Sequence, residues 1–264
     1  MTSTSAVSTR SAKAARSAGP IVLAAAVWIA VWQLAAAAVG HGFLLASPGQ
    51  VLVRLLELVT TGGFWATVAT TLVKIAWGFV AAVVVGAASA ACAARSRTFE
   101  LLTAPLISTI RAVPVVSFII LVLLWADAST LASITAFLMV LPVMHSGILA
   151  GIRSRDSLLL EVVAVFAVPP LRRVGAIDVP AVLPFFAAAC HIGIGLAWKA
   201  GVAAEVIGVA RGSIGEQLYQ AKIFLEPADV FAWTAVIVAL SMACEAVVQR
   251  GIRRAQRTLA GGVA

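Results

Sequence analysis

The sequence predicts an all-α, polytopic membrane protein with about six transmembrane helices. Of its 264 residues, 62% are apolar and only 11% are charged, and the mean hydropathy is +1.05. This composition excludes a soluble domain. A span needs roughly 20 mostly apolar residues, so six spans fit within the chain and leave room for tails and loops. The apolar runs lack the alternation of barrel strands, so helices are expected.

The apolar runs predict six spans in order along the chain. They lie near residues 20–39, 70–94, 106–126, 131–152, 183–210 and 230–249. The first run follows a basic segment and ends in alanines, as a cleaved signal peptide also does, but its length favours a retained helix. Between the first two runs, residues 41–66 predict a short amphipathic helix after Ser47, either lying on the membrane or packed over the bundle.

The distribution of Lys and Arg predicts that both termini are cytoplasmic, because loops on that side carry the positive charge. The opposite side holds only Arg54, Arg211 and Lys222. The net charge of +8 is scattered between apolar runs and forms no stripe, which argues against nucleic acid as a partner and for the bilayer. The chain is therefore expected in the inner membrane. The predicted organisation is a basic tail (1–19), a first span with an external segment (20–66), a membrane core (67–250) and a second basic tail (251–264).

The loop at 153–183, between the fourth and fifth spans, is about thirty residues long, which is unusual for a simple connection. Four apolar residues recur at helical spacing and predict a short amphipathic helix: Leu159, Val162, Val163 and Phe166. Pro169 and Pro170 must end this helix. A second helix is expected to run from near Leu171 toward the fifth span. An apolar face outside the membrane needs a partner or the bilayer surface to cover it.

This loop resembles the EAA signature of ABC importer permeases. In that signature a Glu opens a cytoplasmic helix, a Gly follows six residues later, and an I-x-L-P sequence closes the loop. Glu161 corresponds to the Glu, Ile177 to the Ile, and Pro180 to the closing Pro.

The chain departs from the signature at four positions. Val162 and Val163 replace the two alanines, Ala167 replaces the glycine, and Val179 replaces the leucine. A glycine there permits the bend between two coupling helices. Residues 169–170, both prolines, could force that bend instead.

Other residues resemble the nitrate, sulfonate and taurine branch of the same family. Arg111 and Pro114 look like its R-x-x-P before an inner span, and Trp125 ends that span as a tryptophan does in this branch. Leu196, Trp198 and Glu205 are similar to residues of its fifth span.

The resemblance implies a membrane subunit without catalytic activity. The loop would dock on a separate ABC ATPase, which binds ATP and Mg, and this chain would bind no cofactor. A second permease copy, by default an identical one, would complete the path, and an external substrate-binding protein would deliver the solute. Nitrate, a sulfonate, taurine, bicarbonate or a vitamin precursor would fit the branch. The alternative is a secondary transporter or channel working without an ATPase, with the loop a surface connector.

The sequence itself offers no catalytic motif. None of its lysines follows a glycine, as a phosphate-binding Walker loop requires, and H-E-x-x-H and G-x-S-x-G are absent. The cysteines show no paired spacing, so no metal site is predicted.

The fifth span carries ionisable residues that need an explanation. A lysine such as Lys199 near mid-span costs about 2.5–3.5 kcal/mol, so it must face protein or water. His191, Trp198 and Glu205 are spaced by seven and lie nearly on one face beside it. These residues, with Arg111 and Pro114, are candidates for the transport path or its gate. Structural pairing within the bundle is the competing interpretation.

Overall fold

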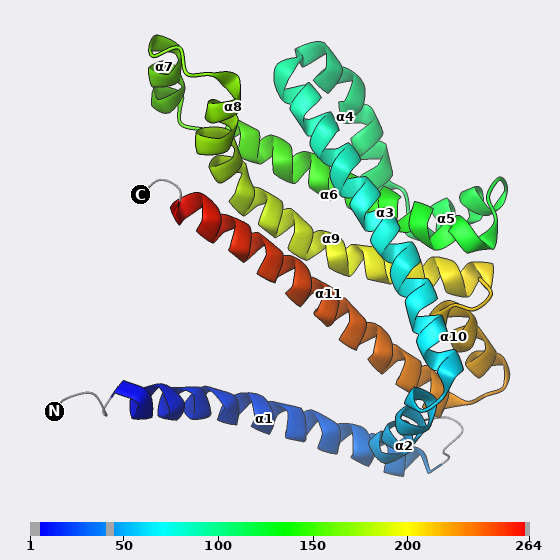
Figure 1. Cartoon of the computed structure of the whole chain (residues 1–264). Helices are drawn as coiled ribbons and strands as arrows, with labels where there is room; N and C mark the ends of the chain where they lie inside the picture. Colours follow the sequence, from blue (N-terminus) through cyan, green and yellow to red (C-terminus); the bar gives the residue numbers. More distant parts are fainter. Residues whose placement is uncertain (1–5, 41–44, 262–264) are drawn as a thin grey trace. The chain divides into compact units, whose positions relative to one another are not determined.

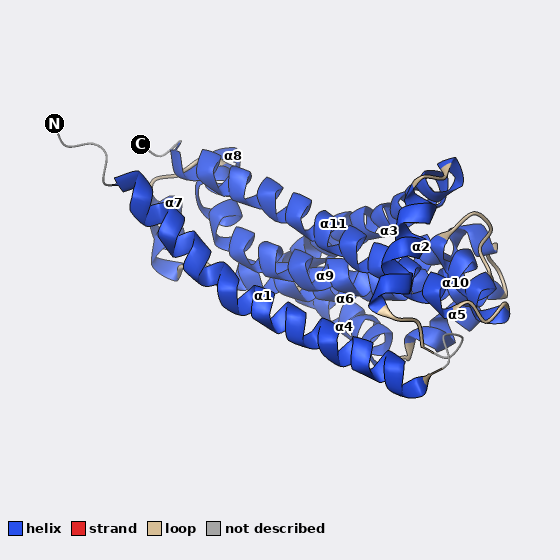
Figure 2. Ribbon diagram, turned by 90° about the horizontal axis from the view of Figure 1, so that it is seen from below, coloured by secondary structure: helices blue, strands red, loops and turns tan. Residues whose placement is uncertain are grey.

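The computed structural model describes residues 6–40 and 45–261, and its regular elements in those ranges are helices (Figure 1, Figure 2). Residues 1–5 and 262–264 of the predicted tails, and 41–44 of the predicted external segment, lie outside the described residues. By compactness the chain divides into a smaller unit, Met1–Thr60 with Gln220–Ala232, and a larger unit, Thr61–Tyr219 with Trp233–Ala264.

The smaller unit holds α1 (Ala6–Val39), α2 (Pro48–Val59) and the first turns of α11 (Pro227–Gly261). The helix predicted after Ser47 is confirmed as α2, and it begins with a capping box. The Ser47 hydroxyl accepts a 3.3 Å bond from the Gln50 amide, and the Gln50 side chain accepts a 2.9 Å bond from the Ser47 amide. Val51 is buried with Ala46 and Ala232, so α2 packs on protein within this unit.

The core of the larger unit is built from α3 (Gly62–Arg95), α6 (Ala128–Arg153) and α9 (Val179–Gly208). Two glycines let α3 and α6 touch backbone to backbone. A Cβ at Gly78 would lie 2.2 Å from the Ser133 carbonyl oxygen, and one at Gly86 would lie 2.6 Å from Met144 Cβ. Such close approach through small residues is typical of helices that associate in a membrane.

The membrane-spanning prediction is confirmed for five helices of the described residues. Each is long and apolar enough to cross a bilayer: Val22–Val39 of α1, Gly62–Arg95, Ala128–Arg153, Val179–Gly208 and Pro227–Thr258 of α11. The third predicted span, 106–126, falls on two helices instead of one.

The chain there forms α4 (Arg97–Ala112) and α5 (Val115–Leu123), which meet at an angle of 100°. Pro114 has no amide hydrogen to continue the helix, and it forces Val113 into an extended conformation at φ −74° and ψ 129°.

The 153–183 loop folds as predicted into two helical pieces. The first is α7 (Ser157–Val165) and the second is α8 (Pro170–Arg173). A π-helical turn, Val174–Asp178, then joins α8 to α9 without a break. After α9 the chain forms α10 (Ile214–Ile223) and then α11.

Candidate functional site

The apolar face of α7 remains uncovered by the described chain. Val162 is 52% exposed and Phe166 is 75% exposed, and Leu158, Leu159 and Val165 are exposed as well. Of the predicted apolar stripe only Val163 is buried, at 8%. Glu161 is exposed beside this face. The helix therefore presents an apolar surface for another molecule, as the amphipathic pattern predicted.

The turn after α7 is made by Ala167, which adopts a left-handed backbone at φ +47°. The Val168 amide donates to the Val163 carbonyl at 3.2 Å, a bond typical of a left-handed helix end. The two prolines follow this turn. Pro170 opens α8, and the Pro169 carbonyl accepts the Arg173 amide at 3.0 Å. Ala167 thus holds the conformation that favours glycine, at the position of the signature glycine.

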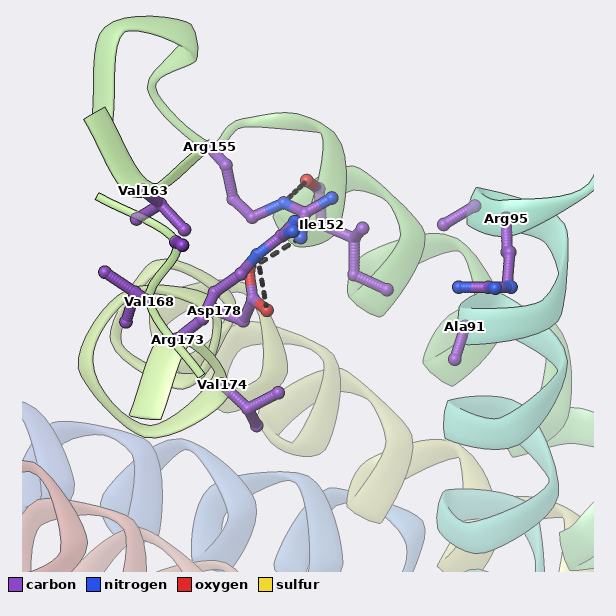
Figure 3. A pocket seen from close by; sticks show the side chains of 11 residues that line it. Ala91, Arg95, Ile152, Arg155, Val163, Val168, Arg173, Val174 and Asp178 are labelled. Carbon is purple, nitrogen blue, oxygen red and sulfur yellow. Dashed lines mark hydrogen bonds and ion pairs between the residues drawn. The ribbon is translucent and has the colours of Figure 1, made fainter. Parts of the chain in front are cut away.

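Asp178 ties the two ends of the segment together (Figure 3). The Arg155 guanidinium lies 2.6 Å from one Asp178 oxygen, and the Arg173 Nε lies 3.6 Å from the other. Arg155 also donates to the Ile152 carbonyl at the end of α6, at 2.6 Å. These contacts join the chain just after α6 to the end of α8 and to the turn that leads into α9.

A cavity of about 700 Å³ lies beside this ion pair. Val163, Val168 and Val174 line one side, and Ala91 and Arg95 of α3 line the opposite side (Figure 3). Ala167 also lines this cavity. The other signature residues lie where the π turn enters α9. Ile177 is half-buried, and Val179 and Pro180 are exposed.

The R-x-x-P residues lie at the break between α4 and α5. Pro114 immediately precedes α5, and Arg111 is in the last turn of α4. Its guanidinium donates to the Pro142 carbonyl at 3.1 Å and to the Ser146 hydroxyl, both on α6. Arg111 therefore holds the end of α4 against α6 and also lines a cavity between them.

The four candidates of the fifth span point in different directions. Trp198 and Glu205 are buried, with exposed fractions of 3% and 0%. His191 is largely exposed, and its Nδ1 lies 2.8 Å from a Glu245 carboxylate oxygen on α11. Lys199 is exposed on the surface of α9. Burial favours the structural interpretation for Trp198 and Glu205, and of the four only Lys199 offers an exposed charge near mid-span.

Sequence reasoning missed the partners of Glu205. Glu205 Oε2 accepts a hydrogen bond from the Thr71 hydroxyl at 2.9 Å and one from the Gly215 amide at 3.3 Å. Its other carboxylate oxygen has no partner among the described residues. Threonine is common in apolar helices, so no sequence signal marked Thr71.

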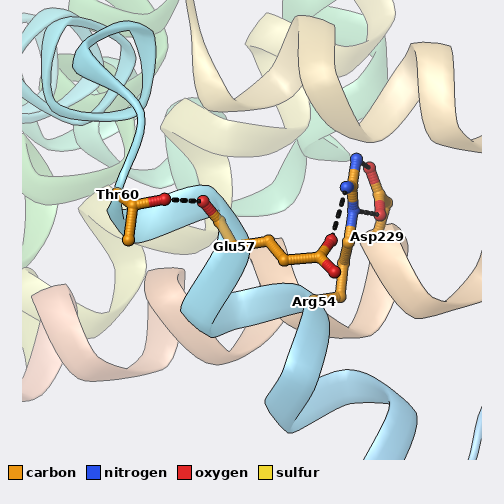
Figure 4. A network of polar contacts seen from close by, with 4 residues as sticks. All are labelled: Arg54, Glu57, Thr60 and Asp229. Carbon is orange, nitrogen blue, oxygen red and sulfur yellow. Dashed lines mark hydrogen bonds and ion pairs between the residues drawn. The ribbon is translucent and has the colours of Figure 1, made fainter.

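Sequence reasoning also missed a polar cluster in the smaller unit (Figure 4). Arg54 forms a forked pair with Asp229, one arm at 3.0 Å, and its Nη1 lies 3.0 Å from a Glu57 carboxylate oxygen. Hydrogen bonds to the Asp229 and Glu57 carboxylates raise the pKa of Arg54 above its ordinary value. This cluster fixes α2 to the start of α11.

Within the described residues, no group of three or more His, Cys, Asp or Glu side chains could hold a metal ion. The features that remain are an uncovered apolar helix, an ion pair at the ends of its segment, and a cavity between α4 and α6 that is lined by both apolar and polar side chains. These suit mechanical coupling and solute passage.

Comparisons with known proteins agree with this geometry. Residues 82–257 match the model of the binding-protein-dependent transport system inner membrane component family. The taurine transport system permease protein TauC of Escherichia coli (strain K12) is 27% identical, over 91% of this chain and 87% of that protein. The putative aliphatic sulfonates transport permease protein SsuC of Bacillus subtilis (strain 168) is also 27% identical, over 80% of this chain and 77% of that protein.

A crystal structure of an amino acid ABC transporter shares the fold, with a TM-score of 0.55 and 17% identity. The match covers 78% of this chain and 96% of that one. The family match takes in α7, α8, α9 and the exposed α7 face. The chain therefore belongs to the binding-protein-dependent transport system inner membrane component family, and it is the permease subunit of an ABC importer.

Proposed function

We propose that this permease carries a small organic anion of the sulfonate type inward, driven by a separate ATPase that docks on α7. The observation that carries the docking proposal is the exposed apolar face of α7, which the described chain does not cover. An apolar helix face outside the bilayer is stabilised when a partner covers it. The ATP and Mg would be bound by that partner, because no lysine of this chain follows a glycine.

Movement of the docked ATPase has a route into the membrane helices. The Asp178 pairs with Arg155 and Arg173 connect the two ends of the segment that contains α7 and α8, next to the end of α6 and the start of α9. These two helices form the core together with α3, so a shift of the docked segment displaces the core helices. Rigid-body coupling of this kind is a known route for switching between two arrangements.

The proposed solute class rests on the relatives and on the charge of the chain. The two relatives above are named for taurine and for aliphatic sulfonates. The chain carries a net charge of +8, and Arg111 and Lys199 present cationic groups on membrane helices. Nitrate, bicarbonate and a vitamin precursor remain the competing solutes for the uptake assay.

The path would lie between this chain and a second permease, by default an identical copy. An external binding protein would deliver the solute, and the Lys- and Arg-rich side with both termini would face the cytoplasm of an inner membrane. An identical second copy is the default because most soluble oligomers are homo-oligomers, and two-fold dimers are the commonest of these.

The experiment compares two variants, each with apolar-to-polar substitutions on an exposed helical face. In vesicles holding the full transporter, Val162→Gln with Phe166→Gln should abolish ATP-driven uptake of ethanesulfonate and release the ATPase on affinity purification. Leu52→Gln is the matched control, because Leu52 is 58% exposed on α2 and is not part of the docking segment. If the α7 variant keeps the ATPase bound and pumps at the wild-type rate, the docking proposal is wrong.

A further inference from the structure

A second cavity, of about 430 Å³, lies between α4 and α6. Its walls are partly apolar, from Ile107, Leu149 and Ala150, and partly polar, from Ser108, Arg111 and Ser146. The volume is within the range of pockets that hold small molecules, and a few polar groups on a mostly apolar wall are typical of such pockets.

The charges around this cavity do not balance. Arg111 donates hydrogen bonds to two neutral oxygens, the Pro142 carbonyl and the Ser146 hydroxyl. No carboxylate pairs with Arg111 in the part of the chain that the structure describes. The cavity's own carboxylate, Glu100, already lies 2.7 Å from Arg153 and 2.9 Å from Arg97. The lining therefore carries two positive charges, on Arg111 and Arg153, and one negative charge, on Glu100. One positive charge is left without a partner of opposite charge in the lining.

The geometry of Arg111 suits an anion. Both of these bonds use the Nη2 nitrogen, while a guanidinium has five N–H donors arranged in a planar fork. Such a fork matches two oxygens of one anionic group better than an ammonium does. Ser108 lies one helical turn before Arg111 on α4 and lines the same cavity, so its hydroxyl can supply a further donor.

We propose that this cavity binds the head group of an organic sulfonate, with the apolar wall covering its short carbon chain. The inference rests on the proposed solute class, and it places a solute site on α4 and α6. The site also lies near the docking segment, because Arg153, which pairs with Glu100, is the last residue of α6 before α7. A shift of α7 could therefore change the cavity's charge balance and release the anion.

The test measures binding of ethanesulfonate to the purified full chain in lipid nanodiscs by calorimetry at low salt. Ethanesulfonamide, which is nearly the same size but neutral, is the matched ligand. Arg111→Gln should weaken ethanesulfonate binding by about 10- to 100-fold, the usual effect of losing charged hydrogen bonds. The affinity of Arg111→Lys for ethanesulfonate should lie between those of Arg111→Gln and the wild type, since lysine keeps the charge but lacks the planar fork.

Arg250→Gln is the control, because Arg250 is an exposed arginine on α11 that does not line this cavity. It should bind ethanesulfonate within twofold of the wild type. If Arg111→Gln remains folded and binds as the wild type does, the site is wrong. Equal binding of the neutral sulfonamide by the wild type would also overturn it.

Failure of this site and failure of the proposed function give different results. If the full transporter pumps ethanesulfonate on ATP while Arg111→Gln binding is unchanged, only the cavity assignment fails. If it pumps no sulfonate at all, the solute class fails, and the cavity assignment fails with it. Release of the ATPase by the α7 variant tests docking independently of both.

Discussion

The hydroxyl of Thr71 donates a 2.9 Å hydrogen bond to a carboxylate oxygen of Glu205, although 134 positions separate the two residues. The same hydroxyl oxygen accepts a 2.9 Å bond from the Ile214 amide at the start of α10. One side-chain oxygen thus joins α3, α9 and α10 where Thr71 and Glu205 are both fully buried. A buried carboxylate is costly unless such bonds satisfy it, so the network stabilises the arrangement of three helices.

Thr71→Val should destabilise the protein by about 1–3 kcal/mol, because Glu205 loses a donor and the Ile214 amide loses its acceptor. The measurement is the thermal midpoint of the purified protein in detergent. Thr70→Val is the control, since the Thr70 hydroxyl donates to the Ala66 carbonyl of its own helix and, among the described residues, joins no second helix. Equal midpoints for the two variants would contradict the role of Thr71.

Gly215→Ala should also destabilise the protein, because there is no room for a side chain. A Cβ at Gly215 would lie 2.2 Å from Glu205 Cβ and 2.6 Å from the Glu205 carbonyl carbon. Such overpacking costs about 1–3 kcal/mol. At Gly195, in α9, no atom lies within 4 Å of the added Cβ, so Gly195→Ala should keep the wild-type midpoint or raise it. A Gly215→Ala protein as stable as Gly195→Ala would show that α10 can move away from Glu205.

Much of this fold was predictable from composition and periodicity. Long apolar runs identified the helices that could span a membrane, and the spacing of Leu159, Val162 and Phe166 identified α7. Both signals come from burial in lipid or protein, which acts over whole segments. The bend at Pro114 was missed because the apolar run continues through it, and hydropathy does not report the direction of the helix axis.

The candidate residues of the fifth span show the limit of helical spacing. Trp198 and Glu205 share one face with His191, yet the first two are buried and His191 is largely exposed. A single helix contacts different neighbours along its length, and its own sequence does not identify them. Glu205 is buried as a structural residue because Thr71 and Gly215 donate hydrogen bonds to its carboxylate, and both donors lie on other helices. They become visible only in three dimensions.

Ala167→Gly should stabilise the turn after α7. Ala167 holds φ at +47°, where a Cβ costs about 1–2 kcal/mol, although glycine also gains freedom in the unfolded chain. The net gain expected is roughly 0.5–1 kcal/mol. Hydrogen exchange of the amides of residues 157–173 in the full transporter should become slower.

Ala69→Gly is the matched control, because Ala69 is an exposed residue inside α3 with ordinary helical backbone. There glycine should cost about 0.5–1 kcal/mol and speed local exchange. Exchange that becomes faster after Ala167→Gly would show that the left-handed conformation is not required in the assembled protein.

Asp178→Asn should loosen the connection between the docking segment and α9. The Asp178 pairs with Arg155 and Arg173 are about one-fifth to two-fifths exposed, so the stability lost is modest, about 1 kcal/mol. The functional effect should be larger, because these pairs connect both ends of the segment. In vesicles holding the full transporter, ATP hydrolysis should continue while less solute is carried per ATP. Arg155→Gln, which leaves the Arg173 contact of Asp178 in place, should give a smaller loss of the same kind. The double variant should behave like Asp178→Asn alone, because the Arg155–Asp178 pair is already broken in that variant. Arg97→Gln is the control, because Arg97 is 74% exposed and the Glu100 it contacts keeps Arg153. Additive losses from Asp178→Asn and Arg155→Gln, or an unchanged transport-to-hydrolysis ratio, would mean that the segment transmits force by another route.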